Sequence, residues 1–155
     1  MNAYFSLKTI HIISSTILFG TGLGTAFFKW FVDRAGNVGA IRIVSEKVVL
    51  ADWLFTSPAI VVQAVTGVVM ANLLRYPLTH GWLAYAIGLY CLAGICWIPV
   101  VVLQLRMRDL ARQAERDGAA LTGRYWIYAR TWFWLGVPAF ASVLIIFCLM
   151  VMKPG

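Results

Sequence analysis

Charged residues are scarce in this chain of 155 residues: they make up 12% of it, and only six are acidic, against 13 Lys and Arg. A soluble domain carries about 25% charged residues. The chain is instead 61% hydrophobic, and its apolar residues gather in stretches of about 20, long enough to cross roughly 30 Å of hydrocarbon. The composition excludes an ordinary soluble domain. It predicts a multi-pass membrane protein with one domain over residues 1–155.

The sequence also lacks the short motifs of most enzymes and metal proteins. Its cysteines, Cys91, Cys96 and Cys148, fall inside apolar stretches without zinc-site spacing, and there is no C-x-x-C-H for covalent haem attachment. No nucleophile elbow, P-loop or dinucleotide fingerprint is present. Membrane topology and anionic lipid explain the basic excess better than nucleic acid does, so we expect a lipid bilayer and no nucleic acid as partner.

Four apolar stretches predict four transmembrane helices, at about residues 4–28, 50–74, 82–105 and 132–152. None of them shows the even alternation of a barrel strand. The first stretch has no basic region before it, so we expect it to be retained rather than cleaved as a signal peptide. The expected fold class is all-α, a bundle of four antiparallel transmembrane helices.

Basic residues are concentrated in two of the three predicted loops. The first loop holds Lys29, Arg34, Arg42 and Lys47, and the third holds the arginines between residues 106 and 130. Because Lys and Arg mark the cytoplasmic side, both loops are expected inside and both termini on the outer, periplasmic side of a bacterial inner membrane.

The stretch after the third span predicts two further features. Residues 106–117 are expected to extend the helix into the cytoplasm as far as Gly118. The aromatic residues between Tyr125 and Trp134 are expected to form a belt at the inner interface, the depth that amphipathic rings prefer.

His11 is the most informative residue of the first span, because an ionisable side chain inside a bilayer is costly and therefore a functional candidate. Neutral imidazole is also a ligand for haem iron. At 100° per residue, one small and polar face of the helix carries His11, Ser14, Ser15, Leu18, Gly22 and Thr25. A purely hydrogen-bonding role for His11 stays open, and Gly20 and Gly24 suit either close helix packing or a flat cofactor.

The second span carries a longer polar stripe, made of Asp52, Thr56, Ala59, Gln63, Thr66 and Met70. Trp53 and Pro58 flank it. Pro58 is expected to kink the helix, with Thr56 or Ser57 satisfying the freed backbone groups. Asp52 either pairs with Lys47 or an inner-loop arginine, or lines a cavity.

Depth in the membrane relates His11 to Met70. Both are expected in the outer half of the bundle, where they could face each other across two helices. A histidine and a methionine form a known axial pair for haem. Haem b, held non-covalently by His11 with Met70 or an unidentified second ligand, is therefore the expected cofactor, while Met70 as a packing residue stays open.

Several segments resemble a family of bacterial integral membrane proteins of unknown function, and more distantly the HemJ-type protoporphyrinogen oxidases and the CopD copper-resistance membrane proteins. They are Leu-Lys-Thr-Ile-His at residues 7–11, the stretch from Leu50 through Pro58 and Gly67 to Trp82-Leu83, residues 106–111 and residues 136–140. The resemblance implies a four-helix membrane bundle. It also implies that His11 matches a histidine associated with b-type haem, and Lys8 its neighbouring lysine.

The chain departs from the HemJ type in its third span, which lacks a lysine at residues 82–86 and a histidine at residues 96–99. The resemblance therefore implies a haem pocket without carrying over protoporphyrinogen oxidation, and a haem-dependent oxidoreductase stays one option. The partner of a redox protein would be a quinone or a porphyrin. The alternatives are an accessory subunit of a larger membrane complex and a small transporter or metal-handling protein, and a homodimer is compatible with each.

Overall fold

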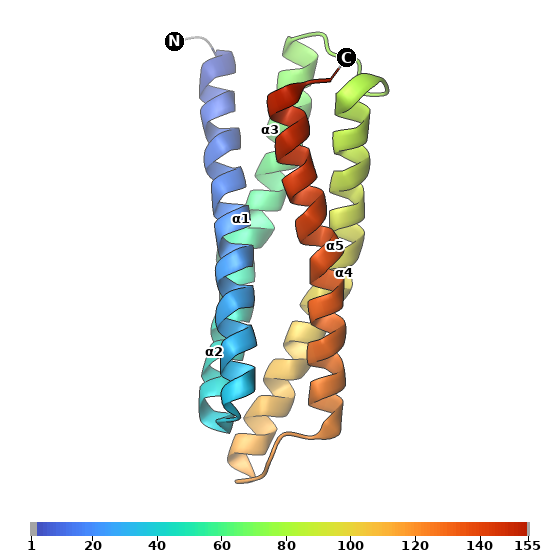
Figure 1. Ribbon diagram of the computed structural model, residues 1–155. Helices are drawn as coiled ribbons and strands as arrows, with labels where there is room; N and C mark the ends of the chain where they lie inside the picture. Colours follow the sequence, from blue (N-terminus) through green and yellow to red (C-terminus); the bar gives the residue numbers. More distant parts are fainter. Residues whose placement is uncertain (1–2, 155) are drawn as a thin grey trace.

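Residues 3–154 are described by a computed structural model, which is helical apart from short connections and contains no strand in that range. The elements in chain order are α1 (Ala3–Ala35), α2 (Val38–Ala51), the π-helical segment η1 (Asp52–Thr56), α3 (Ser57–Leu73), α4 (Gly81–Arg116) and α5 (Gly123–Met152). In the bundle of Figure 1, the start of α1 and the end of α5 lie at the same end. α1 packs on α2 and α3, whereas α4 packs on α2 and α5.

Four helical stretches are long and apolar enough to cross a membrane: Ala3–Ala35, Val38–Leu73, Gly81–Arg116 and Gly123–Met152. Each contains one of the spans expected from hydropathy to within one residue, so the prediction of four helices long and apolar enough to span a membrane is confirmed. The helices are longer than the spans. A 36-residue helix such as Gly81–Arg116 extends about 54 Å, well beyond a hydrocarbon core of roughly 30 Å.

The predicted spans were too short at the helix ends that carry the basic residues. Residues 29–49, expected as a loop, are helical except at Gly36 and Asn37, and the last helix begins at Gly123 rather than near Trp132. Charged residues end a hydropathy peak but not a helix, because Arg, Lys, Glu and Gln favour helix. The extension of the third span was predicted correctly: α4 continues to Arg116, and Gly118 takes a positive φ of 59° in the following turn.

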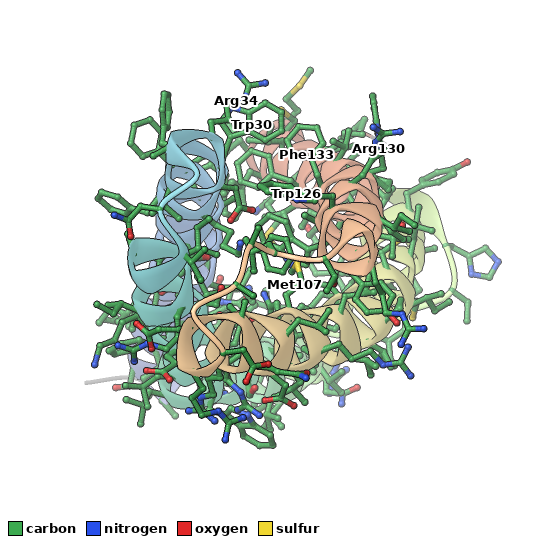
Figure 2. All side chains as sticks on the ribbon, turned by 90° about the horizontal axis from the view of Figure 1, so that it is seen from below. Trp30, Arg34, Met107, Trp126, Arg130 and Phe133 are labelled. Atoms are coloured by element: carbon green, nitrogen blue, oxygen red, sulfur yellow. The ribbon has the colours of Figure 1, made fainter. Side chains whose placement is uncertain are left out.

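The hydrophobic core of the chain lies toward the end of the bundle that carries the basic residues. It is made of Ile41, Val100, Leu103, Met107, Ala111, Tyr125 and Trp132, from α2, α4 and α5. Figure 2, seen from that end, shows Met107 pointing into the space that the helices enclose. Large apolar side chains along the rest of the helices, such as Ile13, Val61 and Ile95, are more than half exposed, as lipid-facing residues of a spanning bundle are.

Ion pairs join α2 to α4 at the same end. Arg42 pairs with Glu46 on its own helix at 3.0 Å and with Glu115 of α4 at 2.5 Å, and Arg112 of α4 pairs with Glu46 at 2.7 Å. All four side chains are partly exposed. These pairs place both carboxylates among arginines, where they offset part of the local positive charge.

A π-helical segment interrupts the second spanning helix just before Pro58. Proline has no N–H to donate and crowds the carbonyl one turn earlier, and the local answer is a wider turn with hydrogen bonds from residue i to residue i−5. The N–H and the hydroxyl of Ser57 both donate to the Asp52 carbonyl, the hydroxyl at 2.8 Å. The Asp52 carbonyl thus has two donors from Ser57, whereas the carbonyl that lacks the N–H of Pro58 in an α-helix is that of Leu54, so the expectation that Ser57 or Thr56 would satisfy the freed group stays a prediction.

Candidate functional site

His11 forms a polar cluster with α3 in the half of the bundle that holds the chain ends. Nδ1 of its ring lies 2.7 Å from the Thr66 hydroxyl. The Gln63 amide donates to the His11 carbonyl at 2.5 Å and to the Ser14 hydroxyl at 2.6 Å. His11, Ser14 and Thr66 are each more than nine-tenths buried. The inward face predicted for the first span therefore meets the predicted stripe of the second.

The hydroxyl of Thr66 lies within hydrogen-bond distance of two groups. It is 2.7 Å from Nδ1 of His11 and 2.6 Å from the Val62 carbonyl, one turn earlier on its own helix. A hydroxyl has one proton, so either Thr66 donates to Nδ1, or it donates to Val62 and accepts from Nδ1–H. In the second arrangement a neutral imidazole keeps its lone pair at Nε2, where it can serve as a ligand.

Gly67 of α3 lies beside the His11 ring. A Cβ built at Gly67 would lie 3.5 Å from Cε1 of the His11 ring, which is ordinary van der Waals contact. Met70 is one turn further along α3 and half-buried, and Ser15 is half-buried and bonds to the carbonyl of Ile12 in its own helix. Lys8 is exposed. The structure thus joins His11 to Gln63 and Thr66, whereas no hydrogen bond joins it to Met70 or Ser15 among the described residues.

Asp52 and Thr56, the other end of the predicted stripe, form a separate cluster. The Thr56 hydroxyl donates to the Asp52 carboxylate at 2.8 Å, both residues are buried, and the Gln104 amide of α4 faces the same carboxylate. The expected pairing of Asp52 with Lys47 or an inner-loop arginine is wrong for the described residues, whose ion pairs do not include Asp52. The carboxylate is satisfied by neutral donors inside the bundle instead.

A cavity of about 490 Å³ lies at the level of Asp52 and Thr56 between α1, α3, α4 and α5. Its lining is almost entirely apolar, and Gly22, Thr25, Asp52 and Thr56 belong to it, together with Trp97 and Trp132. His11, Gln63, Thr66 and Met70 are not part of this lining. The predicted polar stripe is therefore divided into two clusters, and only the inner one borders the cavity.

Trp53 was predicted to flank the polar stripe of the second span, and Gly20 and Gly24 to lie on the first span. Trp53 is 63% exposed and points away from the bundle. A Cβ built at Gly20 or at Gly24 would meet no atom within 4 Å, so these glycines bring no other helix of this chain close. Among residues 3–154, no group of three or more His, Cys, Asp or Glu side chains is arranged to hold a metal ion.

A third buried cluster was not predicted from the sequence. Lys29 of α1 is 1% exposed and bonds to Asp33 at 2.5 Å and to the hydroxyl of Tyr125 of α5, which donates to Asp33 at 2.6 Å. Lys29 was assigned to a loop, and Tyr125 and Trp132 to an interfacial belt, but all three are buried. Trp126 and Trp134 do face outward, at 43% and 64% exposure. The i, i+4 spacing of Lys29 and Asp33 was the available signal.

Two aromatic contacts join α1 to α5 on either side of the cavity. Phe19 stacks on Phe140 with ring centroids 4.8 Å apart, and Trp30 packs on Phe133 at 4.6 Å. Figure 2 shows Trp30 and Phe133 side by side between the two helices, with Arg34 beside them, and the Arg34 guanidinium lies 4.0 Å from the centre of the Trp30 ring. Between these contacts the wall of the cavity is made of small residues such as Gly22 and Gly136.

Four apolar spanning helices around buried polar clusters define an all-helical, multi-pass integral membrane protein. The chain belongs to the family described as predicted integral membrane protein (DUF2269), which matches residues 5–154. No curated protein and no solved structure matches the chain.

Proposed function

We propose that this protein binds haem b inside the bundle and that Nε2 of His11 is an axial ligand of the iron. The observation that carries the proposal is the 2.7 Å contact between the buried His11 ring and the Thr66 hydroxyl. We assign the proton of this contact to Nδ1 of His11, with the Thr66 hydroxyl donating to the Val62 carbonyl 2.6 Å away. The lone pair of the neutral ring is then at Nε2. A histidine whose second nitrogen donates to a fixed acceptor is the common arrangement for metal ligation.

The residues around His11 fit this role. Thr66 orients the ring, Gln63 bonds to the backbone carbonyl of His11, and Gly67 lets α3 lie close to the ring. Met70, one turn beyond Thr66, is our proposed second ligand, since a thioether and an imidazole together raise the reduction potential. Bound haem supplies reversible one-electron chemistry, whereas the protein supplies the ligand, its orientation and a site shielded from water.

We place the protein in the inner membrane of a bacterium as a redox component, with the basic end of the bundle in the cytoplasm and both termini outside. The support is the excess of Lys and Arg at that end. The electron partner would be a lipid-soluble or porphyrin-like molecule. A Cβ at Gly20 or Gly24 would meet no atom of residues 3–154 within 4 Å, and the two glycines form a G-x-x-x-G pair suited to a homodimer.

The visible absorption spectrum of the detergent-purified protein, expressed with ample haem precursor, tests the proposal. We expect a Soret band with sharp α and β bands after reduction by dithionite. His11→Ala should abolish these bands. His80→Ala, which removes an exposed histidine in the loop before α4, should leave them unchanged. A colourless wild-type protein, or equal spectra for both variants, would overturn the assignment.

A further inference from the structure

Two exposed arginines at the basic end of the bundle have no carboxylate partner. Arg34 is in the last turn of α1 and Arg130 is near the start of α5. The ion pairs formed within residues 3–154 include neither of them. By contrast, Arg42, Arg108 and Arg112 at the same end each pair with a carboxylate. The charges of Arg34 and Arg130 are therefore available to an anion from outside the chain.

The contact between Trp30 and Phe133 brings these two arginines to one level. The rings pack with their centroids 4.6 Å apart. Arg34 lies four residues after Trp30, Arg130 lies three residues before Phe133, and α1 and α5 run in opposite directions (Figure 1). At 1.5 Å per residue, both arginines lie about 5 to 6 Å beyond the contact toward the basic end. Figure 2 shows both on the same side of the bundle, near Trp30 and Phe133.

The side chain of Arg34 is ordered by an aromatic ring rather than by an acid. Its guanidinium lies 4.0 Å from the centre of the Trp30 ring, which is a cation–π contact. Such a contact holds the guanidinium in place and leaves its charge without a counter-ion. A planar guanidinium matches the oxygens of a phosphate in pairs, so a phosphate is the anion that this arrangement suits.

Apolar side chains continue from each arginine toward the middle of the bundle. The spacing of seven and four residues places Leu23, Phe27 and Arg34 on or near one face of α1, and Arg130 and Val137 share a face of α5. Leu23, Phe27 and Val137 are 49%, 55% and 43% exposed. The two helices thus present a charged end followed by an apolar strip, which is the order of headgroup and acyl chains in a phospholipid.

Exposed indole rings lie on both sides of the arginine level on α5. Trp126 and Trp134 are each four residues from Arg130, and they are 43% and 64% exposed. Tryptophan gathers where the hydrocarbon meets the lipid headgroups. Arg130, and Arg34 at the same level, therefore lie at the depth of the lipid phosphates.

We propose that this face of α1 and α5 binds an anionic phospholipid. Arg34 and Arg130 bond to its phosphate and headgroup, and its acyl chains lie along Leu23, Phe27 and Val137. Basic pockets between spanning helices recognise such headgroups. A zwitterionic headgroup carries a cation of its own, which the two arginines repel. The site involves neither His11 nor haem.

Native mass spectrometry of the full-length protein in detergent, titrated with phosphatidylglycerol, tests this. Phosphatidylcholine with the same acyl chains is the second arm, and we expect it to bind at least 5-fold more weakly. Arg34→Gln and Arg130→Gln should each weaken phosphatidylglycerol binding by roughly 5-fold, the effect of one basic residue near an anionic lipid. Arg116→Gln is the matched control, because it removes an exposed arginine from α4 at the same end of the bundle and should leave binding unchanged.

The three variants alter exposed side chains without ion-pair partners among residues 3–154, so each should keep the melting temperature of the wild type in detergent. The proposal is overturned if phosphatidylglycerol and phosphatidylcholine bind equally well. It is also overturned if Arg116→Gln weakens phosphatidylglycerol binding as much as Arg34→Gln and Arg130→Gln do, because the effect would then come from net charge rather than from a site.

Discussion

The Thr66 hydroxyl on α3 and Nδ1 of the His11 ring on α1 share a hydrogen bond of 2.7 Å, and the two side chains are 5% and 8% exposed. The bond joins residues 55 positions apart in the chain. The Thr66 hydroxyl also lies 2.6 Å from the Val62 carbonyl of its own helix. The consequences of this pairing for cofactor binding and for stability can be measured separately.

Thr66→Val keeps the shape of the side chain and removes the hydroxyl that bonds to Nδ1 of His11. We expect a loss of haem affinity of about 10- to 100-fold, the usual effect of deleting a group that orients a metal ligand, measured by haem titration of the apoprotein. Thr16→Val removes an exposed hydroxyl that bonds only within its own helix and should change nothing. Equal affinities for the two variants would contradict the orienting role of Thr66.

Asp33→Ala should strongly destabilise the protein, because it leaves the ammonium of Lys29 buried beside α5 without its charged partner. Removing one member of a buried ion pair costs about 3–5 kcal/mol. The measurement is the free energy of unfolding in detergent micelles. Asp109→Ala breaks an ion pair whose carboxylate is 62% exposed, and surface pairs contribute little. A similar loss in both variants would argue against a structural role of the buried pair.

Thr56→Val should lower the free energy of unfolding by about 1–3 kcal/mol, because the buried Asp52 carboxylate loses its hydroxyl donor. In an Asp52→Asn background the same change should cost less, since a neutral amide needs that donor less than a carboxylate does. This double-mutant cycle isolates the interaction. Thr131→Val, at an exposed hydroxyl on α5, serves as the control. A cycle without coupling would show that Thr56 does not support Asp52.

The proposed topology predicts which loops a membrane-impermeant maleimide reaches in intact spheroplasts. In a background with all native cysteines replaced by alanine, Thr79→Cys in the loop before α4 should react from outside. Ala120→Cys, in the loop between α4 and α5, should react only after the membrane is opened. The reverse pattern would show that the basic end of the bundle faces outward.

Hydropathy and helical periodicity accounted for much of this fold. Four spans were located because about 20 apolar residues are needed to cross a bilayer. The faces that carry His11, Gln63 and Thr66 were located because polar groups turn inward in lipid. The continuation of α4 to Arg116 followed from helix-favouring residues and a terminating glycine. These are local properties, and a single sequence contains them.

The axial register between helices could not be predicted in this way. Periodicity gives the face of a helix but not how far it slides along its neighbour, so it could not choose between Thr66 and Met70 as the residue opposite His11. The ends of the predicted stripe belong to different clusters because Asp52 and Thr66 lie about 21 Å apart along the helix axis, too far for their side chains to share partners.

The sequence by itself determined the membrane-spanning class of this protein, the number of its spans and the polar faces that point inward, because lipid imposes these on each helix separately. Only the tertiary structure decided that Lys29 and Tyr125 are buried together, that Thr66 holds the His11 ring, and that a cavity lies between α1 and α5. Each of these depends on side chains from distant segments meeting at one depth, which packing between helices sets.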